Sequence, residues 1–190
     1  MNHMHMQARQ QTMTKLVFIG DSLTQWYDWQ RRFSDHEVSN LGISGETVEG
    51  LLARREHIRL QVHDPDFIFL MTGINDIANG QYHIFEPYHE IVRNFTTWYK
   101  KAQLVIQSIL PVELEWIGSS VIDEANGRLE RLAREFGADY LNVHRSFVDA
   151  AGKVKKGYLS DDGVHLNARG YEAWSHDVER YLRTRDAGKK

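Results

Sequence analysis

The chain has 190 residues, of which 42% are hydrophobic and 26% are charged, as is ordinary for one globular domain. Its formal net charge of -3 provides no global positive field, which argues against a nucleic-acid or anionic-membrane partner. Cysteine is absent, which excludes disulfides, thiolate metal sites and a cysteine nucleophile, and no apolar run approaches the roughly 18 residues of a membrane span.

The first 14 residues, MNHMHMQARQQTMT, are polar and lack the apolar segment of a signal peptide. We expect them to form a flexible tail, which could stem from an expression vector, ahead of a single domain over residues 15–188. The lack of a signal peptide in the chain as given predicts a cytoplasmic location.

Apolar runs that predict strands alternate with segments of helical periodicity. The predicted strands cover residues 15–20, 37–42, 66–73, 102–110 and 138–143. Helices are predicted over residues 46–60, 86–101, 119–136 and 167–185. This alternation predicts an α/β fold, in which a parallel sheet with right-handed crossovers carries helices on both faces.

Polar or small residues follow the predicted strands, at the sheet edge where functional groups collect in such folds. The first strand runs into GDSLT with Ser22, the second into NLGISGET with Gly42, and the third into TGINDI with Asn75. The segment DDGVHLN, with Asp162 and His165, precedes the last predicted helix. We therefore expect these groups to converge.

Three of these residues suit acyl transfer from an ester. A serine hydroxyl such as that of Ser22 is a poor nucleophile until a neighbouring base removes its proton. His165 can act as that base and then as general acid, because histidine exchanges a proton near neutral pH. Asp162 can hold the imidazole in one tautomer and stabilise its cation. Ser22, His165 and Asp162 are thus the predicted catalytic residues.

The tetrahedral intermediate of this reaction carries an oxyanion that needs preorganised hydrogen-bond donors. The N–H of Ser22 is predicted at a helix start, where amide groups lack intrahelical acceptors. Gly42 can bring its N–H close because it has no side chain, and the amide of Asn75 can supply a third donor. These three residues form the predicted oxyanion hole.

Each block by itself also has a plainer interpretation. The serine block could cap a helix, while Gly42 and Asn75 could be ordinary turn residues. Asp161 competes with Asp162 as the orienting acid, although the spacing of three residues from His165 favours Asp162. The four blocks occur in order, each at a predicted strand end or loop, and this order favours the catalytic interpretation.

The blocks GDSLT, NLGISGET, GIND and DGVHLN resemble those of the SGNH (GDSL-type) hydrolases, over residues 15 to about 185. The resemblance implies a three-layer α/β/α sandwich with a five-stranded, flavodoxin-like parallel sheet, and the same roles for the residues named above. Members include esterases, arylesterases, lysophospholipases, thioesterases and carbohydrate acetylesterases, so the substrate stays open. The compact chain is most similar to the lysophospholipase and acetylhydrolase branch.

Other sites after the first strand fit less well. A magnesium-dependent phosphatase would need a second acid where Leu23 stands, and a phosphate-binding loop would need more glycines and a lysine. The G-x-S-x-G nucleophile elbow is broken by Thr24. A catalytically silent binding module is the non-enzymatic alternative, and the intact set of Ser22, Asp162 and His165 argues against it.

The sequence thus predicts a serine esterase for carboxylic esters with short acyl groups. A lysophospholipase, a thioesterase and a carbohydrate acetylesterase are the alternatives. No step needs a metal or cofactor, and the expected partner is a small ester, without nucleic acid or stable membrane insertion. The oligomeric state is left open.

Five further residues are candidates for substrate contacts. Trp26 and Tyr27 follow Ser22 by about one turn, although packing of the first helix on the sheet is the alternative for both. Ile109 and Pro111 follow the fourth predicted strand, and His83 lies in a loop beyond Asn75.

Overall fold

The computed structural model describes residues 13–187. Within them, five strands form one sheet of parallel neighbours in the order β2-β1-β3-β4-β5. The strands are β1 (Lys15–Gly20), β2 (Glu37–Gly42), β3 (Phe67–Met71), β4 (Gln103–Gln107) and β5 (Asp139–Leu141). This is the flavodoxin-like order, so the predicted fold class is confirmed. Apart from Met13 and Thr14, the predicted tail lies outside the described residues.

The third to fifth strands are shorter than their apolar runs. β4 ends at Gln107, although the run continues to Leu110. Ile109 and Leu110 are buried beyond the strand. The side chain of Asn126 bonds both the N–H and the C=O of Ile109, at 2.7 and 2.9 Å. Burial without strand pairing therefore accounts for the extra apolar residues.

Helices connect the strands in the described part of the chain. They are α1 (Ser22–Gln25), α2 (Trp29–Arg32), α3 (Val48–Ala53), α4 (Arg55–Gln61), α5 (Ile74–Ala78), α6 (Phe85–Trp98), α7 (Ser119–Glu135), α8 (His144–Phe147) and α9 (Ala168–Ala187). Between residues 13 and 187, no helix combines the length and the apolar character that crossing a membrane would require.

The single helix predicted over residues 46–60 is wrong, because the structure has two helices there, α3 and α4. They meet at Arg54, whose guanidinium bonds the carboxylate of Glu46 and, at 2.7 Å, the carbonyl of Leu41. α3 also begins later than predicted, because the Thr47 side chain caps it by accepting the N–H of Gly50 at 3.2 Å. Apolar spacing cannot show such polar breaks.

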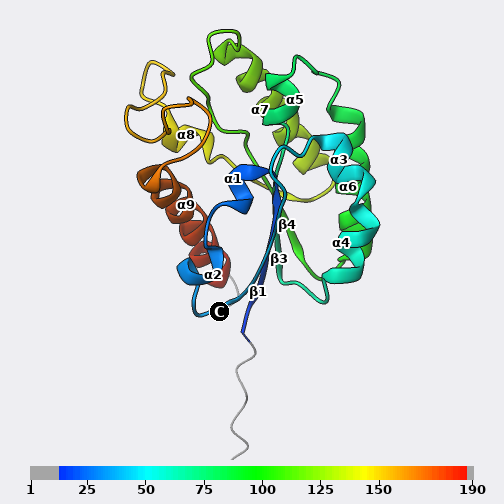
Figure 1. Ribbon diagram of the computed structural model, residues 1–190. Coiled ribbons are helices and arrows are strands. Elements are labelled where there is room, and N and C mark those ends of the chain that lie inside the picture. Colours follow the sequence, from blue (N-terminus) through cyan, green and yellow to red (C-terminus); the bar gives the residue numbers. More distant parts are fainter. Residues whose placement is uncertain (1–12, 188–190) are drawn as a thin grey trace, which may run out of the picture.

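The sheet lies between two layers of helices (Figure 1). Helices α1, α2, α8 and α9 lie on one side of it, and α3, α4 and α6 lie on the other. The first and last of these helices are directly joined, because the hydroxyl of Tyr171 on α9 donates to the carbonyl of Leu23 on α1 at 3.0 Å.

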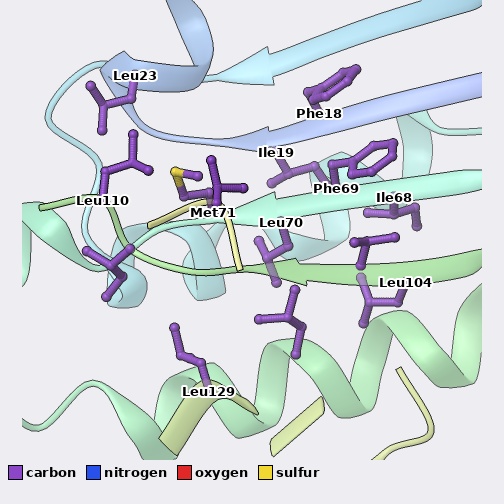
Figure 2. Packing of buried hydrophobic residues seen from close by; sticks show 14 of the residues in the cluster. Phe18, Ile19, Leu23, Ile68, Phe69, Leu70, Met71, Leu104, Leu110 and Leu129 are labelled. Carbon is purple, nitrogen blue, oxygen red and sulfur yellow. The ribbon is translucent and has the colours of Figure 1, made fainter. Parts of the chain in front are cut away.

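Aromatic rings fill the layer between the sheet and α2 and α9. Phe18 of β1 stacks between Trp29 of α2 and Phe69 of β3, with ring centroids 4.0 and 4.9 Å away. Trp174 of α9 meets Trp29 edge-on at 4.8 Å, and its indole N–H donates to Gln107 at 2.8 Å. Figure 2 shows the packing on the sheet, including Phe18 and Phe69. This core fixes α2 and α9 relative to the sheet.

Gly20, the last residue of β1, lies where the strand ends are closely packed. An added Cβ there would lie 2.1 Å from the carbonyl oxygen of Met71 and 2.4 Å from the hydroxyl of Thr24. Because backbone cannot yield easily, we expect Gly20→Ala to lower the free energy of unfolding by about 1–3 kcal/mol or more. Urea unfolding measures the change.

The matched control is Gly127→Ala within α7, where the nearest atom to the new Cβ is 3.7 Å away. Alanine favours a helix over glycine by about 1 kcal/mol, so this variant should be unchanged or more stable. Two variants with equal stability would contradict the close packing at Gly20.

Candidate active site

The structure brings Ser22, His165 and Asp162 into one chain of hydrogen bonds. Ser22 Oγ lies 3.0 Å from Nε2 of His165, although the two residues are 143 positions apart. Nδ1 of His165 lies 2.6 Å from Oδ2 of Asp162. Ser22 begins α1 directly after β1, whereas the other two residues lie in the loop before α9. The predicted nucleophile, base and acid are thus in direct contact.

Asp21 fixes the start of α1 and with it the position of Ser22. Its Oδ1 accepts the N–H of Leu23 at 3.0 Å, which makes Asp21 the N-cap. Ser22 follows as the first helical residue, so its own N–H belongs to the amide groups that have no acceptor within the helix. Its hydroxyl is not used for capping and faces His165.

Asp162 is the acid that contacts the imidazole, rather than its neighbour Asp161. Its Oδ1 accepts the N–H groups of Val164 and His165, each at 2.9 Å, which leaves Oδ2 for the ring. Partial burial acts to raise the pKa of the Asp162 carboxyl, but these hydrogen bonds outweigh it and bring the pKa to about 2. An ionised Asp162 can accept a hydrogen bond from Nδ1–H, which keeps the ring proton on Nδ1 and leaves Nε2 free to accept from the serine hydroxyl.

The end of β2 lies directly against α1. A Cβ at Gly42 would lie 2.4 Å from the backbone nitrogen of Gln25 and 2.8 Å from the carbonyl oxygen of Asp21. No other residue fits this approach without moving the backbone. Glycine at this position therefore allows the predicted oxyanion donor to approach the nucleophile helix.

Asn40 connects the same two elements and was not singled out in the sequence. Its Nδ2 donates to the carbonyls of Thr24, Gln25 and Tyr27, at 3.0, 3.2 and 3.2 Å. Its Oδ1 accepts the N–H of Gly42 at 3.1 Å. The Gly42 N–H therefore already has an acceptor, and an oxyanion would have to share it. The only sequence signal is a polar residue inside a predicted strand.

Asn75 lies at the start of α5, after β3. Its Nδ2 donates to the carbonyl of Glu46 at 2.9 Å, which leaves the second amide hydrogen for another acceptor. The neighbouring Asp76 accepts the N–H of Val48 at 3.0 Å. These bonds tie α5 to the loop after Gly42 and to the start of α3. The sheet order β2-β1-β3 places the three predicted oxyanion donors at adjoining strand ends.

The aromatic residues after Ser22 lie in different surroundings. Trp26 stacks on the ring of His165, with centroids 4.1 Å apart and planes at 19°. Tyr27 stacks on Tyr171 of α9 at 4.7 Å and meets the edge of Trp29 at 4.8 Å. Packing between helices thus accounts for Tyr27, whereas Trp26 lies at the candidate site.

The other predicted substrate contacts are less directly connected to Ser22. Ile109 and Pro111 are buried, and Ile109 lies next to Gly73, where an added Cβ would be 3.0 Å from its side chain. His83 is exposed in the loop between α5 and α6. Their contact with a substrate stays a prediction. Residues 13–187 contain no group of three histidine, aspartate or glutamate side chains that could hold a metal ion.

The sequence also matches a known protein family. Residues 18–173 match the profile of the GDSL-like lipase/acylhydrolase family. The chain belongs to this family. Membership in the GDSL-like family identifies an ester-hydrolysing class of enzyme and leaves the substrate open.

Three similar proteins are informative. The platelet-activating factor acetylhydrolase IB subunit alpha1 of Rattus norvegicus is 26% identical over 171 residues, which cover 83% of this chain and 70% of the relative. A multidomain esterase of Ruminococcus flavefaciens is 28% identical over 168 residues, or 81% of this chain and 21% of that protein. A solved structure from Streptococcus pneumonia, provisionally named a platelet activating factor, superposes with a TM-score of 0.80 at 27% identity, covering 92% of this chain and 86% of that one.

Burial gives Asp21 an unusual protonation equilibrium. Its side chain is 1% exposed, and its Oδ2 has no hydrogen-bond partner among the described residues. Burial, assisted by the charge of Glu46, raises the pKa of the Asp21 carboxyl to about 7, against the lowering effects of the Leu23 N–H and His165. The sequence suggested a cap at this position but not a buried acid.

We expect Asp21→Asn to stabilise this protein at neutral pH, because asparagine keeps the capping oxygen and removes a buried charge. An acid with a raised pKa in the folded state lowers the free energy of unfolding as pH rises from its unfolded to its folded pKa, here from 3.8 to about 7. The advantage of the variant should grow across this range and then level off, with an upper limit of about 4 kcal/mol. Urea unfolding at a series of pH values measures it, and parallel curves for both proteins would contradict the raised pKa.

Proposed function

We propose that this protein is a serine esterase that hydrolyses carboxylic esters through an acyl-enzyme on Ser22. The observation that carries the proposal is the hydrogen-bond chain of Ser22, His165 and Asp162, with contacts of 3.0 and 2.6 Å. A base within hydrogen-bond reach of the nucleophile, itself oriented by a third group, is the arrangement that activates a serine hydroxyl. Family membership supports the same class of reaction.

In the proposed reaction, Nε2 of His165 accepts the hydroxyl proton of Ser22 while Oγ attacks the ester carbonyl carbon. The tetrahedral intermediate collapses as the imidazolium returns that proton to the leaving alcohol, which forms the acyl-enzyme. Water then attacks the acyl carbon and gives a proton to His165, and the imidazolium returns this proton to Oγ of Ser22 as the bond from the acyl carbon to Oγ breaks and the acid leaves. Asp162 is ionised near neutral pH and stabilises the imidazolium in both halves.

The oxyanion would be bound at the adjoining strand ends. The N–H of Ser22 and the second amide hydrogen of Asn75 are the two donors that the described contacts leave for it. The N–H of Gly42 would be shared with Asn40. Each donor of this kind typically contributes about 3 kcal/mol to stabilising the transition state.

Short acyl groups, acetyl above all, are the proposed substrates. Ile109 is 2% exposed and Leu110 is 1% exposed, so the segment after β4 offers no open apolar surface for a long acyl chain. The acetylhydrolase name of the rat relative supports the same choice. Longer acyl esters, lysophospholipids, acyl-thioesters and acetylated sugars are the alternatives that the test must separate.

We expect wild type to hydrolyse p-nitrophenyl acetate faster than the butyrate and octanoate esters, and Ser22→Ala to lower kcat by at least about 1000-fold because the nucleophile is missing. A panel that adds a lysophospholipid, an acyl-thioester and acetylated xylose measures the preference. Circular dichroism of Ser22→Ala controls for folding. Equal and negligible rates for wild type and Ser22→Ala on every substrate would favour the binding module instead.

We expect kcat/KM for p-nitrophenyl acetate to fall at acid pH, because a protonated His165 cannot accept the proton of Ser22. The Asp162 carboxyl, with a pKa of about 2, adds no further step above about pH 4. The pKa of Asp21 is about 7, so the profile is repeated with Asp21→Asn, and the acid limb should persist in that variant. Undiminished activity at pH 4 in a folded protein would contradict the role of His165.

A further inference from the structure

The two ring hydrogen bonds of His165 restrain one motion of the imidazole only weakly. Ser22 contacts Nε2 and Asp162 contacts Nδ1, so both bonds lie near the line through the two ring nitrogens. Bonds along one line fix the position of the ring but oppose tilting about that line only weakly, because hydrogen bonds weaken slowly over the first tens of degrees of misalignment. The side-chain bond to Cβ limits this tilt, and a contact against the face of the ring restrains it further.

Trp26 makes that contact. Its indole lies 4.1 Å from the imidazole of His165, at 19° to it, in the stacked geometry that aromatic pairs favour. The indole is nevertheless 57% exposed, so burial alone does not explain its position. By contrast, Trp29, three residues further along the chain, is buried in the core.

The plane of the indole is itself fixed by a polar contact. The indole N–H of Trp26 donates to Oγ of Ser44 at 2.9 Å. Ser44 in turn donates its N–H and its hydroxyl to Oε1 of Gln25, at 2.8 and 2.5 Å. Gln25 and Trp26 end α1, whereas Ser44 follows Gly42, so the indole is held between the nucleophile helix and the loop after β2.

We propose that Trp26 is a positioning residue, which fixes the plane of the His165 imidazole for proton transfer with Ser22. The indole face also attracts the imidazolium cation that forms when the serine proton is transferred. Ser44 supports this role by fixing the indole. The inference rests on the proposed function, and it differs from the sequence prediction that Trp26 contacts the acyl group.

The two roles of Trp26 predict different kinetics. Loss of a positioning contact should lower kcat for every ester while KM stays nearly constant, because the ground-state binding of the substrate is not touched. Loss of an acyl contact should change KM or the ranking of acetate against butyrate. A displacement of about 1 Å at a reacting group can cost about 100-fold in rate, so an effect of about 10-fold to 100-fold is expected.

The experiment compares Trp26→Leu, Trp26→Phe and Ser44→Ala with wild type on p-nitrophenyl acetate and butyrate. Leucine keeps apolar bulk without an aromatic face, phenylalanine keeps a face without the N–H, and Ser44→Ala leaves the indole without its anchor. We expect Trp26→Leu to lower kcat by about 10-fold or more on both esters, Trp26→Phe to recover most of the loss, and Ser44→Ala to fall between them.

A spectroscopic readout reports on the stack without hydrolysis. Because the imidazole of His165 stacks on the indole in wild type, we expect the ring current of Trp26 to shift the carbon-bound ring protons of His165 upfield, and NMR of the histidine-labelled protein would measure this. Trp26→Leu should remove this shift, and Trp26→Phe should retain part of it. The matched control is Trp98→Leu, at the end of α6 that leads back to the start of β4, which should change neither this shift nor kcat.

The outcomes separate the two proposals. If wild type is active and Trp26→Leu keeps its kcat, or changes only in KM or acyl preference, the positioning role is overturned. The proposed function is unaffected by that result. A wild type no faster than Ser22→Ala overturns the proposed function and the positioning role with it. Loss of kcat together with loss of the ring-current shift, in a variant with unchanged thermal stability, supports the positioning role.

Discussion

Helix α1 lies on the end of β2 with no room for a side chain between them, and the geometry of the site depends on this contact. Gly42 supplies the space, and Asn40 ties the strand to the carbonyls at the end of the helix. Because α1 starts directly after β1, the same contact determines where Ser22 stands relative to the neighbouring strand ends. Removing the contact would separate the proposed nucleophile from the N–H of Gly42 without changing either residue.

The sequence predicted the site best where the fold itself brings strand ends together. Ser22 and Asn75 follow predicted strands and Gly42 ends one, and a parallel sheet gathers such positions at one edge whatever the exact strand lengths. Asp162 and His165 lie on one turn, so their contact required no knowledge of the fold. The end of β4 at Gln107 and the break between α3 and α4 at Arg54 were missed, because apolar spacing records burial and carries no information on polar partners.

Some side chains have a role that is set by a partner far away in the sequence, and strand order does not predict such a role. Trp26 and Tyr27 are adjacent and similar in the sequence, yet one lies on His165 and the other on Tyr171. The two aspartates of the site differ for a related reason. Asp162 is exposed and accepts two backbone N–H groups, whereas Asp21 is buried and accepts one, so their pKa values move in opposite directions.

The bond from Tyr171 on α9 to Leu23 on α1 joins the two ends of the fold at the candidate site. In the described part of the chain, Ser22 follows the first strand, whereas His165 comes after all five strands and precedes α9. A nascent chain could complete most of the sheet while its nucleophile still lacked a base. Activity would therefore arise in one late step, when α9 docks, and it would be lost early if α9 detached while the sheet persisted.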